Sequence, residues 1–315
     1  MDNCIVPTKE TVINVECATK IKSSIDTKIF NFISYLLTSV FAIVCVIPFY
    51  LVFVGSFTDE KSILTKGFSF FPGVKNLSLE AYRIILNSPN SIISAYGVTI
   101  LVTVCGTFLA ILIVTMTGYV LSRPDFPWRN FFSFFFFFTT LFSGGLVPWY
   151  LLCTKYLHFT DNIYALIIPG LFSVWNMIIT KSFMKGIPYE LVESAKMDGA
   201  SDPLIYFKIM LPLSKPLIAT LSLFTALGYW NDWYNCMLYI NNHKMWNLQY
   251  MLQNILNSAE SMTRIANQTG MVVASVPTES VKMAMTVVAT GPIILLYPFL
   301  QKYFVKGITI GSVKG

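Results

Sequence analysis

The sequence predicts an all-α membrane protein with six transmembrane helices, and three observations support this prediction. Hydrophobic residues make up 55% of the 315 positions and charged residues only 12%, which is about half the charged fraction of a soluble domain. Six charge-poor runs are near or beyond the ~20 residues that a helix needs to cross a bilayer. Because the runs are continuously apolar rather than alternating, we expect helices and not a barrel.

The expected spans follow one another along most of the chain. They lie near residues 31–57, 93–121, 130–152, 163–184, 216–240 and 284–303. Residues 1–28 form a polar N-terminal arm, residues 29–305 the membrane domain and residues 306–315 a C-terminal tail. The first apolar run is too long for the core of a cleavable signal peptide, so we expect it to be retained as a span.

The distribution of Lys and Arg predicts how the spans are oriented. With both termini on one side, that side holds 14 of the 22 basic residues, and an excess of Lys and Arg marks the cytoplasmic side. Both termini and the polar segment 186–216 are therefore expected in the cytoplasm, and the loops 58–92 and 241–282 outside. We read the net charge of +6 as this topology signal, because no basic face typical of nucleic-acid binding is visible.

Phenylalanine, glycine and proline mark features of the third and fourth spans. The run Phe131–Phe138 is almost wholly Phe, which favours a lipid-facing helix over a ligand site. Gly144-Gly145 with Pro148 interrupts the third span, and Pro169-Gly170 interrupts the fourth. These residues predict kinks or close helix contacts, which transport paths use and which membrane helices in general tolerate.

Each external loop contains one segment with a helical pattern. In the first loop a short helix is expected to be capped by Ser78, with Glu80 in its first turn, and to end at Asn87-Ser88-Pro89. In the second loop a helical patch is expected near residues 248–256. A long structureless loop is uncommon, so we expect local structure and a binding partner for residues 241–282.

No group of side chains predicts an enzyme. His158 and His243 lie in the external loops, apart from any cluster of Cys, Asp or Glu. The chain lacks the G-x-x-x-x-G-K-[ST] loop that cradles nucleotide phosphates. The six cysteines show neither metal-ligand spacing nor a disulfide framework, and are interpreted as packing residues. No metal or cofactor is expected in this chain.

Asp232 is a charged residue in the outer part of the fifth expected span. Charge at the centre of a membrane helix costs at least ~2.5 kcal/mol, so such residues usually face a polar cavity or a partner. One hypothesis is that Asn231 and Asp232 line a translocation path. The other is that Asp232 lies at the membrane surface beside the interfacial aromatics Trp230 and Trp233.

The polar segment 186–216 is predicted to fold as a helix, a tight turn and a second helix. Pro188 suits a first helical turn, and the negative charge of Glu190 favours the positive end of the helix. Gly199 can close that helix in the left-handed conformation. Asp202-Pro203 is expected to start the next helix, with Asp202 as N-cap, and Leu211-Pro212 to end or bend it.

The motifs of this segment are spaced as in a known family. Glu193-Ser194-Ala195, Asp198-Gly199-Ala200, Ile209, Leu211-Pro212 and Pro216 resemble the EAA loop of ABC importer permeases. The resemblance extends over most of residues 30–315, is greatest to the second permease of maltose-type carbohydrate importers, and lies nearest the branch associated with complex oligosaccharides. Residues 302–315 resemble the C-terminal tail of that group. Ser194 stands where alanine is commoner, and the segment 258–276 is longer than in typical relatives.

The resemblance implies roles for individual residues. The first short helix would be a coupling helix seated in a cleft of a cytosolic ATPase, with Glu193 paired to a basic residue of that ATPase. The implied coupling residues are Glu190, Glu193, Ser194, Ala195, Asp198, Gly199, Ala200, Ile209, Leu211 and Pro212. The tail, with Gly307, Gly311 and Lys314, would reach the ATPase dimer interface.

The resemblance also implies the partners and the mechanism. The expected partners are a cytosolic ATPase dimer that binds ATP and Mg, a second homologous permease, an extracytoplasmic solute-binding protein and the lipid of a bacterial plasma membrane. Sugar, expected to be an oligosaccharide, would be imported by alternating access while ATP is hydrolysed on the separate subunit. The alternative is a secondary transporter or channel driven by an ion gradient, for which only Asp232 is an intramembrane carboxylate. A membrane receptor or scaffold is a third class.

Overall fold

The computed structural model describes residues 25–86, 89–269 and 278–311. Within these ranges the elements are helical, and one isolated antiparallel bridge joins Thr58 to Leu77. This confirms the all-α prediction. The chain divides into two compact units, residues 1–50 and residues 51–315, which are considered separately here.

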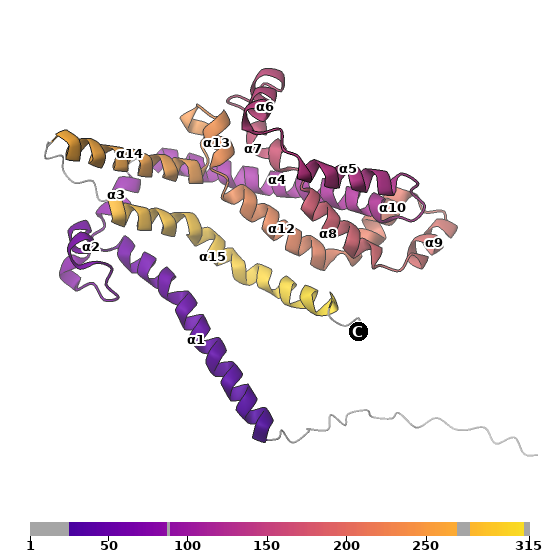
Figure 1. The fold of residues 1–315 in the computed structure, drawn as a ribbon, viewed down its shortest axis with the longest axis horizontal. Coiled ribbons are helices and arrows are strands. Elements are labelled where there is room, and N and C mark those ends of the chain that lie inside the picture. Colours follow the sequence, from indigo (N-terminus) through magenta and orange to yellow (C-terminus); the bar gives the residue numbers. More distant parts are fainter. Residues whose placement is uncertain (1–24, 87–88, 270–277, 312–315) are drawn as a thin grey trace, which may run out of the picture. The chain divides into compact units, whose positions relative to one another are not determined.

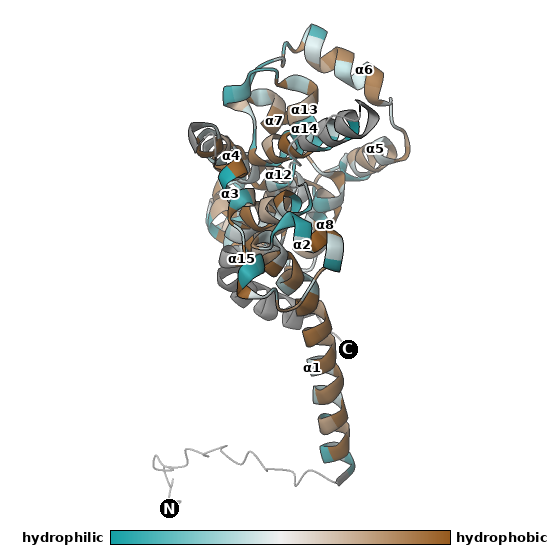
Figure 2. Cartoon of the chain, turned by 90° about the vertical axis from the view of Figure 1, so that its left-hand side faces the viewer, coloured by the Kyte–Doolittle hydropathy of each residue, from teal (hydrophilic) through white to brown (hydrophobic). Residues whose placement is uncertain are grey.

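The first unit contains most of α1 (Ile25–Ser56). This helix covers the first expected span, and its described residues are apolar along most of its length (Figure 2). Pro48 lies inside the helix, a position that membrane helices tolerate because neighbouring groups satisfy the freed carbonyl. The first expected span is therefore confirmed as one continuous helix.

The second unit consists of α-helices joined by short 3₁₀ and π-helical turns, of which η2 and η4 are π-helical. In chain order these elements are α2 (Glu60–Lys66), η1 (Val74–Asn76), α3 (Glu80–Ile85), α4 (Pro89–Ser122), α5 (Arg129–Leu141), α6 (Leu146–Leu151), η2 (Leu152–Tyr156), α7 (Tyr164–Ile167), η3 (Ile168–Gly170), α8 (Val174–Lys185), α9 (Glu190–Met197), α10 (Asp202–Ile205), η4 (Tyr206–Met210), α11 (Leu211–Leu213), α12 (Lys215–Trp230), α13 (Tyr234–Tyr239), η5 (His243–Met245), α14 (Leu248–Thr269) and α15 (Thr278–Gly311).

The long helix α4 is the element against which the second unit is built. It packs against α8, α12 and α14 (Figure 1). At one crossing the ring of Tyr229, on α12, lies where a Cβ on Gly106 or on Gly170 would come within 3 Å of it. The Tyr229 hydroxyl donates a hydrogen bond of 2.8 Å to the carbonyl oxygen of Ile167. Two glycines thus let one aromatic side chain join α12 to α4 and η3.

The N-terminus of α15 is held by a buried carboxylate from α2. Glu60 accepts hydrogen bonds from the backbone amides of Glu279 and Ser280 at 3.0 and 2.9 Å, and from the Ser280 hydroxyl at 3.0 Å. The first amides of a helix have no partner inside it, so a carboxylate placed there satisfies them. Trp230 also donates to the carbonyl oxygen of Ala289 at 3.0 Å, which fixes α15 against α12.

Two helices of the described residues are long and apolar enough to cross a membrane, or up to five if each bent pair is one span. The two are α1 and α4, which match the first two expected spans. The bent pairs are residues 129–141 with 146–156, 164–170 with 174–185, and 202–213 with 215–230, with bends of 113°, 47° and 82°. The sixth expected span, 284–303, lies within α15.

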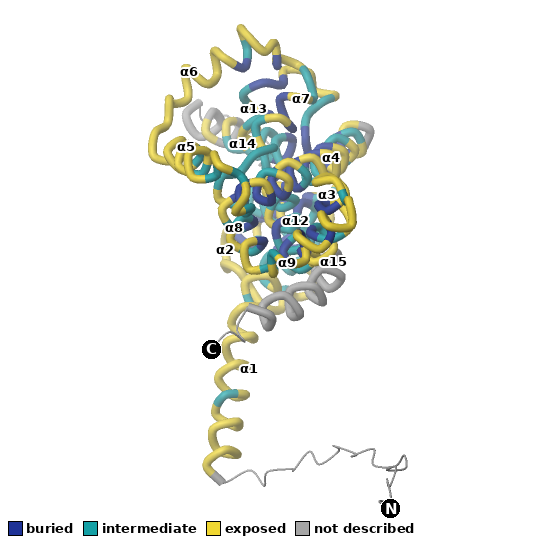
Figure 3. Tube along the Cα trace, turned by 90° about the vertical axis from the view of Figure 1, so that its right-hand side faces the viewer, coloured by how far each residue is buried: buried dark blue, intermediate teal, exposed yellow. Residues whose placement is uncertain are grey.

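The third and fourth spans are interrupted near the Gly and Pro residues that predicted kinks, whereas the expectation of one helix over residues 216–240 is wrong for the fifth span. The third breaks at residues 142–145, where Gly145 has a φ of +83° that a continuing helix cannot contain. The fifth ends at Trp230, and α13 follows as a separate short helix. Figure 3 shows α5 and α6 exposed along their length, which agrees with a lipid-facing Phe-rich helix.

The helical patch expected near residues 248–256 is confirmed, but the helix is longer. As α14 it continues to Thr269. Its apolar face packs on α15, with Leu248, Met251 and Leu252 buried. The short helix expected after Ser78 is α3. Its N-cap is Leu79 and not Ser78 as expected, although the Ser78 hydroxyl accepts a hydrogen bond of 3.2 Å from the Glu80 amide. The helix ends at Ile85, and residues 87–88 of its expected end lie outside the described residues.

Candidate functional site

The helix α9 is two-faced. Val192 and Ala195, three positions apart, are buried, whereas Glu190, Glu193 and the other charged residues are exposed. Residues three apart share a helix face, so burial of this pair turns the acidic first turn outward. The helix starts at Glu190 rather than at Pro188 as expected, because Tyr189 takes the N-cap place.

The tight turn after α9 forms as predicted. Gly199 has a φ of +80°, and the amides of Gly199 and Ala200 donate to the carbonyl oxygens of Lys196 and Ala195, both at 2.9 Å. These two bonds define a Schellman cap, which requires a left-handed residue and therefore favours glycine. A Cβ at Gly199 would meet nothing within 4 Å, so the requirement is conformational and not steric crowding.

The second helix of the segment starts and ends differently from the prediction. Ser201, not Asp202, has the extended backbone of an N-cap, with φ −72° and ψ 155°. The helix runs through Pro212 to Leu213 and then bends by 82° into α12. The widened π-helical turn η4 directly before Leu211 leaves room for the proline ring. Asp202 is not a cap because its carboxylate reaches Arg123.

The inner faces of both helices pack on the end of α4. Val192 and Ala195 share a buried cluster with Tyr119 of α4 and with Tyr206 and Met210 of η4. The rings of Tyr119 and Tyr206 lie 5.6 Å apart, and the Tyr206 hydroxyl hydrogen-bonds the Thr115 hydroxyl at 2.8 Å. The segment is therefore anchored to α4 by aromatic packing.

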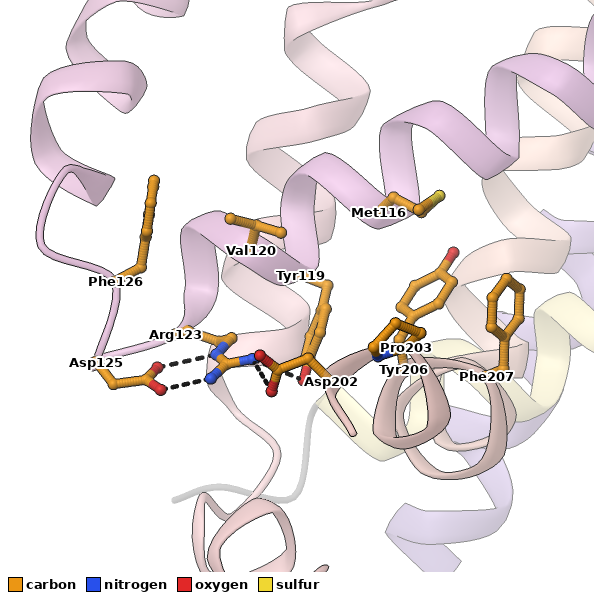
Figure 4. Close-up of a pocket in the computed structure, with 10 residues that line it drawn as sticks. All are labelled: Met116, Tyr119, Val120, Arg123, Asp125, Phe126, Asp202, Pro203, Tyr206 and Phe207. Atoms are coloured by element: carbon orange, nitrogen blue, oxygen red, sulfur yellow. Dashed lines mark hydrogen bonds and ion pairs between the residues drawn. The ribbon is translucent and has the colours of Figure 1, made fainter. Parts of the chain in front are cut away.

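Four charged side chains surround the turn. Arg123, just beyond α4, pairs with Asp125 through two hydrogen bonds, one of them 2.8 Å from Nε to Oδ1, and also pairs with Asp202. Lys196 of α9 lies 2.8 Å from Asp125 Oδ2. Figure 4 shows the Arg123 guanidinium between the carboxylates of Asp125 and Asp202. The hydrogen bonds from Arg123 hold the pKa of Asp125 well below its ordinary value of 3.8.

A mostly apolar recess of about 320 Å³ lies beside these charges. Met116 and Val120 of α4 and Pro203 and Phe207 of the second helix are among the residues that line it (Figure 4). Its charged lining residues, Arg123, Asp125 and Asp202, are paired with one another. The recess therefore offers packing surface and no group poised for chemistry.

The structure brings the ten expected coupling residues into one segment and exposes its acidic side. Neither Glu190 nor Glu193 forms an ion pair with any residue that the structure describes. Ser194, Asp198 and Pro212 are also exposed, whereas Ala200, Ile209 and Leu211 are half-buried. The outer face of α9 thus carries uncompensated negative charge on a firmly packed base.

The other expected site residues lie elsewhere. Gly307 and Gly311 belong to α15, and Lys314 lies outside the described residues. Asn231 and Asp232 follow the far end of α12, ~24 Å along that helix from Lys215. Within the described ranges no group of three or more His, Cys, Asp or Glu side chains could hold a metal ion.

Asp232 lies between α12 and α13 and not inside one continuous helix as expected. Its carboxylate accepts hydrogen bonds from the Asn235 amide at 3.1 Å and from Asn235 Nδ2 at 2.8 Å, near the start of α13. Its carbonyl oxygen accepts a hydrogen bond from Asn247. Asn231 is exposed and accepts a hydrogen bond of 3.2 Å from Gln249.

Comparison with known proteins shows the family. The sequence model of one protein family, described as binding-protein-dependent transport system inner membrane component, matches residues 17–310 of this chain. The chain belongs to this family. As an inner-membrane component it is a permease, so the expectation that it is not itself an enzyme is confirmed, and the gradient-driven alternative receives no support.

Curated relatives and a solved structure agree with this membership. The permease is 41% identical to the polygalacturonan/rhamnogalacturonan transport system permease protein YtcP of Bacillus subtilis, over 91% of this chain and 99% of that protein. It is 40% identical to Protein LplC of the same organism, over 86% and 90%. A bacterial ABC transporter that imports the acidic polysaccharide alginate contains a chain of TM-score 0.73 and 27% identity, with 90% and 99% covered. The permease thus has the all-helical MetI-like fold.

Sequence reasoning missed the role of the loop between α4 and α5. Arg123 and Arg129 entered the prediction only as basic residues that indicate the orientation of the spans, and no role was expected for Asp125. The available signal was the pattern Arg123-Pro124-Asp125, which places opposite charges two residues apart in a short loop. Only the folded chain shows that both also reach the segment that follows α8.

Proposed function

We propose that this permease is the membrane subunit of an ATP-driven importer of oligosaccharides and that α9 is the element on which a separate ATPase acts. One observation carries the assignment of α9. The helix buries Val192 and Ala195 against α4 and presents Glu190 and Glu193 outward without a partner among the described residues. An exposed acidic face on a rigid base suits a basic cleft of another protein.

The proposed assembly has four kinds of partner. A cytosolic ATPase dimer carries ATP and Mg and receives α9, with Glu193 paired to a basic residue of its cleft. The tail with Gly307, Gly311 and Lys314 reaches the interface of that dimer. A second homologous permease completes the membrane path, a solute-binding protein delivers substrate from outside, and lipid surrounds the spans.

We propose six spans with both termini and α9 in the cytoplasm of a bacterial cell. The basic residues of the sequence support this orientation, and α15 supplies the sixth span. Closure of the ATPase dimer would move α9 and switch the spans between outward-open and inward-open states. We place Asn231, with Asp232 beside it, on the translocation path, because Asn231 is exposed and its amide can bind sugar hydroxyls.

Uronate-containing oligosaccharides are the first substrates to test. This choice rests on the polygalacturonan/rhamnogalacturonan permease at 41% identity and on the importer of the acidic polysaccharide alginate. More distant relatives are named for arabinooligosaccharides and galactooligosaccharides, each at 27% identity. A panel of oligogalacturonide, arabinooligosaccharide and galactooligosaccharide in proteoliposomes with the complete complex would identify the substrate. Import that continues without ATP would contradict the proposal.

Charge reversal at Glu193 tests the docking role directly. Loss of one member of an interfacial charge pair costs ~2–5 kcal/mol, so Glu193→Lys should weaken co-purification of the ATPase by about 30-fold or more. Glu80→Lys, at an exposed position of α3, makes the same charge change away from the proposed contact and should retain the ATPase. Equal recovery of the ATPase with both variants would contradict the assignment of α9.

A further inference from the structure

The turn at Gly199 is flanked by two side chains, each of which pairs with one member of the Arg123–Asp125 ion pair. Lys196 precedes the turn and Asp202 follows it, and they lie at the end of α9 and the start of α10. Lys196 pairs with Asp125, and Asp202 pairs with Arg123. Because Arg123 and Asp125 also pair with each other, one charged group links both sides of the turn to the loop after α4.

The four side chains of this group have no net charge, and one of their ion pairs has a fixed geometry. Two cations face two carboxylates, and the planar guanidinium of Arg123 holds Asp125 through two hydrogen bonds. Such a bidentate pair fixes orientation as well as distance. The Arg123 side chain is only 11% exposed, whereas Lys196 and Asp202 are 38% and 55% exposed. A mostly buried residue just beyond α4 therefore pairs with Asp202 directly and is linked to Lys196 through Asp125.

Stability does not explain this arrangement well. Exposed ion pairs contribute ~0–1 kcal/mol each, and the buried cluster of Val192, Ala195 and Tyr119 already anchors α9. The ion pairs add something that the apolar cluster lacks. They restrain the direction in which the end of α9 and the start of α10 can move. Gly199, which lies between these two ends, has no side chain and open space around it.

The helix that receives this restraint is central to the second unit. Arg123 follows the last residue of α4 by one position, and α4 packs along α8 and α12. A displacement of α9 that is transmitted to Arg123 therefore acts on the helix with the broadest packing. Coupling between sites requires such a physical connection between elements.

We propose that Arg123 and Asp125, with Lys196 and Asp202, form a clamp that transmits movement of α9 to α4 and so ties ATP hydrolysis to transport. This inference rests on the proposed function, in which the ATPase moves α9. The four are positioning residues: they contact neither ATP nor sugar, and they set how far a movement at the docking face reaches the spans.

The test compares sugar imported with ATP hydrolysed in proteoliposomes that contain the complete complex. Lys196→Gln and Asp125→Asn each remove two ion pairs without a large change in volume: those of Lys196 with Asp125 and Asp202, and those of Asp125 with Arg123 and Lys196. Residues that carry coupling change it by ~0.5–2 kcal/mol, so the amount of the imported panel oligosaccharide per ATP should fall by about two- to thirtyfold. Recovery of the ATPase on purification should be unchanged, because Glu193 is intact.

Two further variants separate the clamp from a general effect of charge or folding. Lys196→Arg keeps a cation that can pair with Asp125 and should restore the wild-type ratio. Lys208→Gln removes an exposed lysine of the same segment that pairs with no described carboxylate, and it should leave the ratio unchanged. If the Asp125→Asn complex does not assemble, Lys196→Gln decides, because its side chain is partly exposed and only its pairing is lost.

Each result bears on one hypothesis. Wild-type import with an unchanged ratio in Lys196→Gln and Asp125→Asn would overturn the clamp and leave the proposed function standing. A Lys196→Arg complex as defective as Lys196→Gln would also overturn it, because the ion pair would not be what matters. A wild-type complex that imports no member of the panel with ATP would overturn the proposed function, and the clamp with it.

Discussion

Glu60 and Ser280 are joined by two hydrogen bonds, from the backbone amide and from the hydroxyl of Ser280, at 2.9 and 3.0 Å. Glu60 is 7% exposed, and its carboxylate also accepts a hydrogen bond from the amide of Glu279 at 3.0 Å. One side chain of the short helix α2 thus caps a helix that begins more than 200 residues later. This contact ties the segment between α1 and α3 to α15.

Loss of the Glu60 carboxylate should destabilise the permease. Glu60→Ala leaves several buried donors unsatisfied, which costs about 1–3 kcal/mol. Thermal unfolding in detergent should show a lower midpoint for Glu60→Ala, while Glu80→Ala, at an exposed position in the first turn of α3, stays near wild type. Equal midpoints for the two variants would show that the amides of α15 find other partners.

The close contact at Gly106 predicts a position-specific effect within one helix. A Cβ on Gly106 would lie 2.6 Å from the ring of Tyr229, whereas a Cβ on Gly97, also on α4, would meet nothing within 4 Å. Gly106→Ala should therefore cost ~1–3 kcal/mol through overpacking, and Gly97→Ala should be neutral or slightly stabilising. Unfolding midpoints of the two variants test this, and a neutral Gly106→Ala would mean that Tyr229 moves freely.

The left-handed conformation of Gly199 predicts a graded series. Asparagine tolerates positive φ better than other residues with a side chain, and a β-branched residue tolerates it least. Coupling of ATP hydrolysis to import should decrease from Gly199 through Gly199→Asn to Gly199→Val. Gly228→Ala, in ordinary helix with open space around it, is the control for loss of a glycine. Wild-type coupling in Gly199→Val would contradict the role of the turn.

Asp232 provides a test between local structure and the translocation path. Its carboxylate accepts a hydrogen bond from the Asn235 backbone amide, and the side-chain oxygen of an asparagine can accept the same bond. Asp232→Asn should keep the fold, and Asp232→Ala should lose ~0.5–2 kcal/mol, as on removal of an N-cap. Uptake separates the roles: a path residue should show altered transport in Asp232→Asn, and full transport with unchanged specificity would remove Asp232 from the path.

The loop between η2 and α7, which contains Asp161, predicts a dependence of stability on pH. The backbone amides of Asn242 and Asn241 donate to the Asp161 carboxylate and lower its pKa from the ordinary value of 3.8. Because the pKa is lower in the folded state, the stabilisation is present above the unfolded pKa and is lost as pH falls below it. Acidification from pH ~6 to pH ~3 should lower the unfolding midpoint more for wild type than for Asp161→Asn.

A matched variant completes this comparison. Asp59→Asn removes a carboxylate that makes no side-chain capping bond, and its midpoint should follow wild type across the same pH range. A parallel response of wild type and Asp161→Asn would show that the two amide contacts do not persist in solution.

The sequence determined the membrane class, the helical content and the turn at Gly199. These depend on composition and on local backbone preferences, which act within a few residues. Continuous apolar runs can satisfy their backbone in lipid only as helices or closed barrels, and a positive φ after α9 favours glycine wherever the segment lies. The motif spacing of residues 193–216 also suffices to indicate the family that the comparison shows.

Only the tertiary structure decided how sharply the spans bend, where the fifth span ends and which charges meet. Gly and Pro mark the interruptions of the third and fourth spans, but their bends of 113° and 47° depend on packing. The fifth span reads as a single apolar run, yet its helix ends at Trp230. Aspartate is a residue type that favours the N-cap position, but the Asp202 carboxylate pairs with the guanidinium of Arg123, which α4 places beside it. Ion pairs between residues about 70 positions apart depend on how helices pack, and no local pattern encodes that.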